Sequence, residues 1–365
     1  MKTVVHDKKA TSTVTTRFTI GEGNTPLIPS RFIGPSLGLK NLYFKLENLN
    51  PTGSYKDRFA AAFIGTLLQK KAAFCLATSS GNTGAALAAY CAAARISCYV
   101  VIVDNAPADK IRQMHAYGAR TLMVEGFGID TEITKAVFSG LEKLAKTKDL
   151  SLPISAYRYC PEGMQGVETI TQEIQTTLNG AVDHLFSPSG GGGLTLAVAN
   201  GVLSSATPVS CRVHCVQPRG NNTIAGALRN GLAYAAETPK STTAISGLQV
   251  PGILDGNKTL QRCRQTGGTG FVVTDEAVYD MQKTLAQKEG IFCEAAGAVS
   301  VSGLAEAVRN GEVAADDTIV CLITGSGFKD MNSPARNAVT EPVETKYTVD
   351  NLFHFLATLQ ANDPI

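Results

Sequence analysis

The sequence predicts an α/β fold in which parallel sheets carry helices on both faces. Short apolar runs alternate with segments of helical period along most of the chain, and glycine-rich turns follow two of the apolar runs. Hydrophobic residues make up 44% of the 365 residues and charged residues 18%, so the chain can bury a large core. A chain of this length predicts one large domain or two interlocked ones.

In the first half of the chain, strand and helix patterns follow one another. A helix is expected to begin at Lys56, because apolar residues then recur at helical spacing through residue 68. The other expected elements are a strand over 74–77, an alanine- and glycine-rich helix over 82–94, a strand over 97–103, a helix opened by Pro107, a strand over 120–124 and a helix over 131–146.

The second half repeats this alternation. The expected elements are strands over 182–186, 211–216, 271–274 and 318–323, and helices over 194–203 and 276–288. Residues 236–270 are rich in Thr, Ser and Gly and are expected to form irregular loop, and 349–359 has the pattern of a docking helix. Because the glycine turns follow strand ends, a ligand is expected at the carboxyl edge of the sheet.

Composition excludes several classes of partner. The net charge of +2 gives no case for nucleic acid or an anionic membrane surface, and no run of 18 apolar residues is present. Residues 1–17 are polar and do not resemble a signal peptide, so a cytoplasmic location is expected. Nine cysteines occur singly, without a Cys-x-x-Cys motif, which predicts buried free thiols and no metal site.

Three segments together indicate a cofactor. Residues 50–58 read Asn-Pro-Thr-Gly-Ser-Tyr-Lys-Asp-Arg, residues 78–84 read Thr-Ser-Ser-Gly-Asn-Thr-Gly, and Ser189 precedes four glycines. A lysine can form a Schiff base, and consecutive glycine N–H groups at a helix start can bind a phosphate. A lysine, a Ser/Asn loop and a glycine turn are what an enzyme needs to hold pyridoxal phosphate.

These segments resemble the motifs of fold-type II pyridoxal-phosphate enzymes, and specifically of threonine synthases. Residues 50–58 are similar to the family's lysine motif, and 21–27, Gly-Glu-Gly-Asn-Thr-Pro-Leu, to its N-terminal motif. Residues 294–298, Glu-Ala-Ala-Gly-Ala, resemble its EPASA segment, and 324–330, Thr-Gly-Ser-Gly-Phe-Lys-Asp, its TGHGLKD segment. The matches occur in family order over most of the chain.

The resemblance implies a role for each of these residues. Lys56 would carry the cofactor and move the α-proton, Asn82 would bond the 3′-oxygen of the ring, and Thr324 would contact the pyridine nitrogen. The phosphate would be bound by Gly190, Gly191, Gly192, Gly193 and the amide of Leu194. The substrate carboxylate would be bound by Ser79, Ser80 and Thr83.

Each feature taken alone also has a plainer interpretation. Lys56 could be a solvated lysine at a helix start, the Asn82 segment an ordinary capped turn, and the glycines a linker. A linker would not normally lie directly between an apolar strand and an apolar helix. Thr324 could cap a strand end, but the order of the motifs favours the cofactor site.

The sequence departs from the family at the site of the leaving group. Threonine synthases bind the substrate phosphate with an arginine, whose position falls on Gly163 in the simplest alignment. Arg158 lies five residues earlier and could substitute only if the loop is rebuilt. Ser326 replaces a family histidine, and Gly84 resembles the cysteine-synthase-like enzymes. Arg158 is therefore the candidate for binding substrate phosphate.

The resemblance also implies two doubly wound sheets with the cofactor between two domains. Residues 51–160 would form the small domain, and 18–50 with 161–345 a discontinuous large domain, flanked by an arm over 1–17 and a tail over 346–365. A homodimer is expected, with a small amino-acid substrate as the partner.

The expected reaction is elimination or replacement at the β or γ carbon of an O-activated amino acid. The parent reaction converts O-phosphohomoserine and water to threonine and phosphate. The alternatives are β-replacement on an activated serine, as in cysteine or cysteate synthesis, and deamination of serine or threonine. A non-catalytic protein that binds the cofactor or a partner is the remaining possibility.

Overall fold

The computed structural model describes residues 18–79, 81–104, 108–205, 210–331, 333 and 348–353, with only the backbone of 108–110. Within these ranges the strands form a six-stranded sheet, in the order β1-β2-β9-β6-β7-β8, and a three-stranded sheet, β3-β4-β5. β1 pairs with β2 in antiparallel fashion, and the other strand pairs are parallel. The predicted α/β class is confirmed.

The strands are β1 Leu27–Pro29, β2 Asn41–Leu46, β3 Phe74–Thr78, β4 Ser97–Ile102, β5 Arg120–Met123, β6 His184–Pro188, β7 Arg212–Pro218, β8 Gly270–Val273 and β9 Thr318–Ile323. The helices are α1 Ile33–Ser36, α2 Lys56–Gln69, α3 Asn82–Ala94, α4 Ala108–Ala116, α5 Thr131–Thr147, α6 Pro161–Thr177, α7 Gly193–Leu203, α8 Ala225–Arg229, α9 Gly256–Gln265, α10 Asp275–Thr284 and α11 Ala295–Arg309. No helix of this part of the chain is long and apolar enough to cross a membrane.

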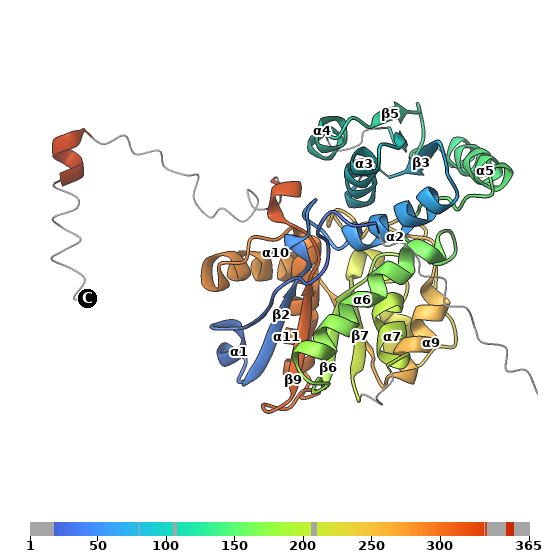
Figure 1. Ribbon diagram of the computed structural model, residues 1–365. Coiled ribbons are helices and arrows are strands. Elements are labelled where there is room, and N and C mark those ends of the chain that lie inside the picture. The colour runs from blue at the N-terminus through green and yellow to red at the C-terminus, as the bar shows by residue number, and fades with distance from the viewer. Residues whose placement is uncertain are drawn as a thin grey trace, which may run out of the picture.

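Helices cover the large sheet on both faces. Along β9, Ile319, Cys321 and Ile323 belong to the core that includes α11, whereas Val320 and Leu322 belong to the core that includes α6 and α7. Successive residues of a strand point to opposite faces, so an uninterrupted apolar run is needed when both faces are buried. Figure 1 shows α10 and α11 on one side of this sheet and α6, α7 and α9 on the other.

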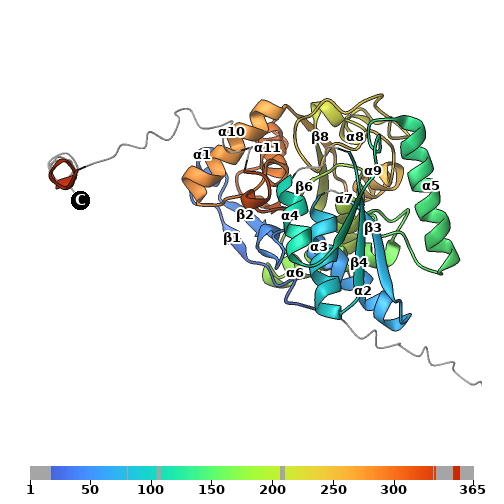
Figure 2. The same ribbon diagram turned by 90° about the horizontal axis from the view of Figure 1, so that it is seen from above.

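The small sheet forms a separate layer with α3, α4 and α5 (Figures 1 and 2). α2 packs against both α3 and α6, so it connects the small sheet to the helices of the large one. The loop that leads into α2 is also attached to the end of β9. Tyr55 N donates to Thr324 O at 3.1 Å, and Ser326 N donates to Gly53 O at 2.8 Å. The start of α2 is therefore held by both parts.

Two expectations need correction. Residues 236–270, expected to be irregular, contain the helix α9, which buries Thr259, Leu260 and Cys263. The first strand of the second half begins at His184 rather than Val182 and extends to Pro188. His184 pairs with Arg212 and Ile319, whereas Val182 N bonds Gly180 O in a turn.

The cysteines are buried, but they are not all isolated from one another. The nine thiols are buried in the described structure. The Sγ atoms of Cys75, Cys91 and Cys98, on β3, α3 and β4, lie within 4.8 Å of one another. Cys75 and Cys98 are direct partners in the β3–β4 register, and no spacing in the sequence indicated this cluster.

Candidate active site

A cavity of about 650 Å³ opens at the carboxyl ends of strands from both sheets. Thr78 ends β3, Pro188 ends β6, and Thr324 directly follows β9, and each of them lines the cavity. Parallel strands direct their following loops to one edge, so loops distant in sequence meet there. The cavity therefore brings together residues from both halves of the chain.

Lys56 is the first residue of α2 and lines this cavity. Its Nζ donates to Ser155 Oγ at 2.8 Å and lies 4.5 Å from the centroid of the Tyr55 ring. Ser155 was not identified from the sequence, because it lies 99 residues from Lys56 in an irregular segment. The hydroxyl holds the lysine amine in one position within the cavity.

The turn before Lys56 is fixed by its own polar groups. Gly53 adopts a φ of +86°, a conformation that favours glycine. The Asp57 carboxylate accepts bonds from Thr52 N at 3.0 Å and Thr52 Oγ1 at 2.7 Å. Burial raises the pKa of Asp57 to about 6, although the bonds from Thr52 oppose this shift. The chain neighbours of Lys56 thus fix the position of its backbone at the start of α2.

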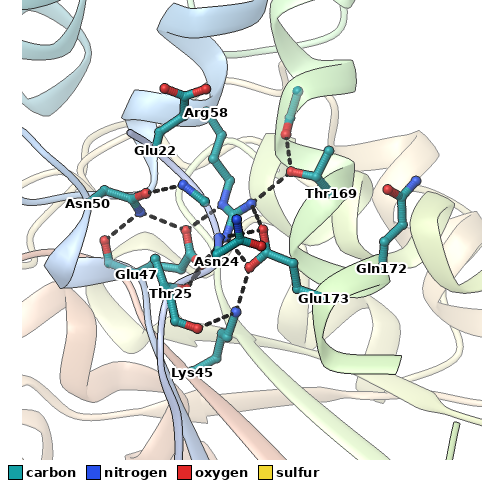
Figure 3. Close-up of polar contacts among 12 residues, drawn as sticks. Glu22, Asn24, Thr25, Lys45, Glu47, Asn50, Arg58, Thr169, Gln172 and Glu173 are labelled. Carbon is teal, nitrogen blue, oxygen red and sulfur yellow. Dashed lines mark hydrogen bonds and ion pairs between the residues drawn. The ribbon is translucent and has the colours of Figure 1, made fainter. Parts of the chain in front are cut away.

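Arg58, in the first turn of α2, belongs to a network of polar contacts with Glu47 and Glu173 (Figure 3). Its guanidinium donates to both Glu47 oxygens at 2.7 Å and to the Glu173 oxygens at 2.6 and 2.8 Å. Lys45 donates to Glu173 at 2.6 Å. Burial opposes ionisation of Glu173, but the bonds from Arg58 and Lys45 lower its pKa to about 2. This buried network connects the start of α2 to β2 and α6.

Asn82 begins α3 directly after the loop that follows β3. Its Nδ2 donates to Glu294 Oε1 at 2.8 Å, and both residues line the cavity. Its Oδ1 is buried and has no hydrogen-bond partner in the described structure. An unsatisfied buried carbonyl oxygen costs about 1–3 kcal/mol, which a hydroxyl of a bound ring would offset. Glu294 belongs to a motif noted in the sequence, but its contact with Asn82 was not predicted.

The glycine turn, residues 190–193, runs from β6 into α7 along the cavity wall. Three of its carbonyls face the protein: Gly190 O accepts from Gln217, Gly191 O from Asp255 N and Gly192 O from Thr259. No N–H group of residues 190–194 bonds another described residue. Free N–H groups at a helix start form an anion site.

The remaining predicted residues divide into three groups. Thr324, 3% exposed, lines the cavity, as do Ser79, Thr83 and Leu194. Ser80 lies outside the described residues. Arg158 is exposed and does not line the cavity. Its guanidinium carbon lies 5.5 Å from the Tyr159 ring centroid, and its backbone N–H donates to Asp255 Oδ1. The role of Arg158 in binding substrate stays a prediction, and this geometry does not support it.

Comparison with known proteins identifies the family. A family model described as pyridoxal-phosphate dependent enzyme matches residues 18–325. The chain belongs to this family. Threonine synthase of Methanocaldococcus jannaschii is 31% identical over 344 residues, 93% of this chain and 82% of that protein. Threonine synthase of Methanosarcina acetivorans is 32% identical over 318 residues, 86% of this chain and 76% of that one.

Solved structures show the same fold. Maize serine racemase superposes with a TM-score of 0.70 at 21% identity, covering 92% of each chain. Threonine deaminase isoform 2 of Solanum lycopersicum superposes with a TM-score of 0.70 at 22% identity, covering 86% of this chain and 83% of that one. The protein is thus a fold-type II enzyme of the threonine-synthase-like group, and its cofactor is pyridoxal 5′-phosphate.

The cavity suits this cofactor. The unpartnered Asn82 Oδ1 and the free N–H groups of the glycine turn lie along one cavity, with Lys56 and Thr324. A Cβ on Gly192 would lie 2.5 Å from Thr259 Oγ1, so the backbone there is packed without room for a side chain. These groups offer an acceptor, anion-binding donors, an amine and a neutral hydroxyl, which match the polar groups of the cofactor.

Proposed function

We propose that this enzyme removes the α-proton of an amino acid and then eliminates or replaces a substituent at its β or γ carbon. The observation that supports this most strongly is the position of Lys56 Nζ in the cavity with Asn82, Thr324 and the glycine turn. The chain resembles threonine synthases, and this resemblance implies conversion of O-phosphohomoserine to threonine as the parent reaction.

Lys56 would act as the base. A lysine amine in a partly buried cavity can accept a proton from the α carbon and later return one to a neighbouring carbon. Ser155 accepts the bond from Lys56 and donates to Met164 Sδ at 3.5 Å, a weak acceptor, so its oxygen lone pair stays directed at the amine. When bound, pyridoxal phosphate supplies the electron sink for the α carbon.

The other residues would position the reactants. Ser79, Thr83 and the amino end of α3 would bind the substrate carboxylate, with Ser80 as the third hydroxyl residue. Thr324 would place a neutral hydroxyl at the pyridine nitrogen, which would not hold a full proton there. That weakens the electron sink and favours elimination or replacement over chemistry that needs a longer-lived carbanion.

Two alternatives remain within the same chemistry. Solved neighbours include a threonine deaminase and an O-ureido-L-serine synthase, which share the fold at 20–22% identity. β-Replacement on an activated serine and deamination of serine or threonine both begin with the same proton removal. They differ from the parent reaction in the substituent that leaves the substrate.

Covalent labelling tests the assignment of Lys56. Borohydride reduction of the holoenzyme followed by peptide mass spectrometry should place the cofactor on Lys56. Lys56→Ala should abolish turnover of every amino acid while the protein still folds, whereas the exposed Lys146→Ala on α5 should match wild type. A label on another lysine, or turnover by Lys56→Ala, would refute the proposed function.

A further inference from the structure

Three cysteines form a compact cluster where α3 packs on the small sheet. Cys75 lies on β3, Cys91 on α3 and Cys98 on β4, and their Sγ atoms all lie within 4.8 Å of one another. Cys75 and Cys98 are partners in the parallel register of β3 and β4, and Cys91 joins them from the helix that packs on both strands. Three separate elements therefore direct one thiol each to the same point.

The cluster is buried among apolar side chains. The three cysteines are at most 7% exposed, and they belong to one hydrophobic core. Thiols in such surroundings stay protonated, because burial disfavours the thiolate. A net charge formed at this point would lose its hydration, at a large cost in free energy. The cluster therefore favours a ligand whose adduct with the thiols is neutral.

This requirement distinguishes among the elements that bind thiols. Zinc with three thiolates carries one net negative charge and takes a fourth ligand, whereas the group formed by the described residues offers three ligand atoms. Monovalent copper with three thiolates carries two net negative charges. Trivalent arsenic with three thiolates is neutral and needs no fourth ligand. Three bonds of about 2.3 Å, the length of a zinc–thiolate bond, need sulfur atoms about 4 Å apart or less, which small side-chain rotations can reach.

We propose that Cys75, Cys91 and Cys98 form a binding site for trivalent arsenic, taken up as arsenite. At neutral pH arsenite is an uncharged trihydroxide, so it enters apolar surroundings at a lower cost than an ion does. In the binding step three S–H bonds and three As–OH bonds break, three As–S bonds form, and three water molecules leave. Arsenic stays trivalent, so the step needs neither an oxidant nor a reductant.

A small cavity brings the protein surface close to the cluster. Cys75 lines this cavity of about 20 Å³, together with Phe63 and Leu67 of α2 and Leu144 of α5. The volume is that of about one water-sized group. Leu144 is 39% exposed, so the cavity adjoins solvent. An uncharged reagent of a few atoms therefore has a short route to the first thiol.

The elements that carry the cluster also lead into the candidate active site. Thr78 ends β3, Asn82 begins α3, and both residues line the active-site cavity. An arsenic atom bound to all three thiols would tie β3, α3 and β4 together and shift the loop between Thr78 and Asn82. Arsenite should therefore lower turnover without competing with the amino acid.

Binding of arsenite to the reduced holoenzyme tests this inference. Native mass spectrometry should show that each chain gains one arsenic atom and loses three hydrogen atoms, and X-ray absorption should show three As–S bonds. Anomalous diffraction from a crystal soaked in arsenite should place the arsenic between the three Sγ atoms, a result that needs no variant. Arsenic bound by other residues, or an enzyme that stays free of arsenic in excess arsenite, would overturn the inference.

Removal of one thiol should weaken arsenite binding at least tenfold, because one of the three As–S bonds is lost. Cys91→Ala and Cys98→Ala make this change on α3 and on β4. Cys321→Ala is the matched control, since Cys321 is a buried cysteine of β9, and it should bind arsenite as wild type does. Circular dichroism and retained cofactor show that each variant folds. Wild-type affinity for arsenite in Cys91→Ala and Cys98→Ala would contradict the inference.

Zinc tests the argument from charge. By isothermal titration, the cluster should bind zinc at least tenfold more weakly than arsenite, and equally tight binding of zinc by the same three thiols would refute that argument. Turnover of wild type and Cys321→Ala should fall at arsenite concentrations that leave Cys98→Ala unaffected. Equal inhibition of all three proteins would place the inhibitory arsenic elsewhere and contradict the inference.

Discussion

At the scale of single residues, the bond between Ser155 and Lys56 joins two distant parts of the chain. Lys56 could be assigned from its flanking motif, because the turn and helix start that hold it are local. Ser155 could not, because its contact with Lys56 spans 99 residues and depends on how α2 packs on the following loop. The same holds for Asn82 and Glu294, which are 212 residues apart.

Replacing Ser155 should slow proton transfer more than substrate binding. Ser155→Ala removes the hydroxyl that positions the lysine amine, so kcat should fall about tenfold with KM little changed. Ser155→Thr keeps the hydroxyl and should restore most of the rate. The direct measurement is exchange of the substrate α-proton with deuterated water. Equal losses in the alanine and threonine variants would show that the hydroxyl does not matter.

Burial of Glu173 beside Arg58 and Lys45 should make stability depend on acid pH. Its pKa falls from 4.5 to about 2 on folding, so its contribution is fully present above pH 4.5 and is lost as pH falls toward 2. Glu173→Gln should flatten this part of the pH profile. At pH 7 it should destabilise the protein by about 3–5 kcal/mol, because two buried cations lose a partner.

Denaturant unfolding at pH 7, 4.5 and 3 measures both effects of this substitution. Glu132→Gln on α5 is the control, since Glu132 pairs with Lys135 in an exposed position. A profile for Glu173→Gln as steep as that of wild type between pH 4.5 and 3 would contradict the assignment.

At the scale of secondary-structure elements, the helices that could be predicted best were those preceded by recognisable turn residues in the sequence. α2, α3 and α7 follow turns whose glycines and polar residues show in the sequence, and each begins within one residue of its expected start. α9 was missed because its polar composition resembles that of a loop, and its apolar side chains are Leu260 and Cys263 alone. The cysteine cluster was missed because it arises from strand register, not from spacing.

The glycine turn gives the prediction that belongs to this scale. Gly192 has a φ of +99° and would place a Cβ 2.5 Å from Thr259 Oγ1, so Gly192→Ala must move the turn. Cofactor affinity should fall at least tenfold, corresponding to about 1.4 kcal/mol or more of strain transferred to the site. Dialysis against cofactor-free buffer, followed by absorption spectroscopy, measures this.

Gly140→Ala is the matched control, because a Cβ there meets nothing within 4 Å and the residue lies on α5. It should retain the cofactor as wild type does. Retention by Gly192→Ala at the same level would mean that the turn accommodates a side chain and that its backbone does not hold the phosphate.

At the scale of the whole molecule, the site depends on how the two sheets are held together. The cofactor-binding residues could be identified from the sequence because their motifs are short. The cavity that they line forms only when the two sheets and their helices pack together. Lys329 shows this clearly. Lys329 belongs to the segment 324–330 and is buried, with Nζ donating to Thr52 O at 2.8 Å and to Gln113 Oε1 at 2.7 Å.

Lys329 thus joins three segments: the short turn over residues 327–329 that follows β9, the loop before Lys56, and α4 beside the small sheet. Lys329→Met keeps the length of the side chain but leaves the carbonyl of Thr52 and the amide oxygen of Gln113 without this donor. It also removes a cation that lowers the pKa of Asp57. The expected loss of stability is about 2–4 kcal/mol, measured by denaturant unfolding.

Lys329→Met should also affect catalysis, because it displaces the turn before Lys56 and not because Lys329 takes part in the reaction. We expect KM for the amino acid and the cofactor dissociation constant to rise several-fold, while borohydride labelling still maps to Lys56. Lys40→Met is the control, because Lys40 pairs with Asp316 in an exposed position and its loss should leave stability close to that of wild type. If Lys329→Met loses stability but binds cofactor and substrate as wild type does, Lys329 holds the fold together without positioning the site.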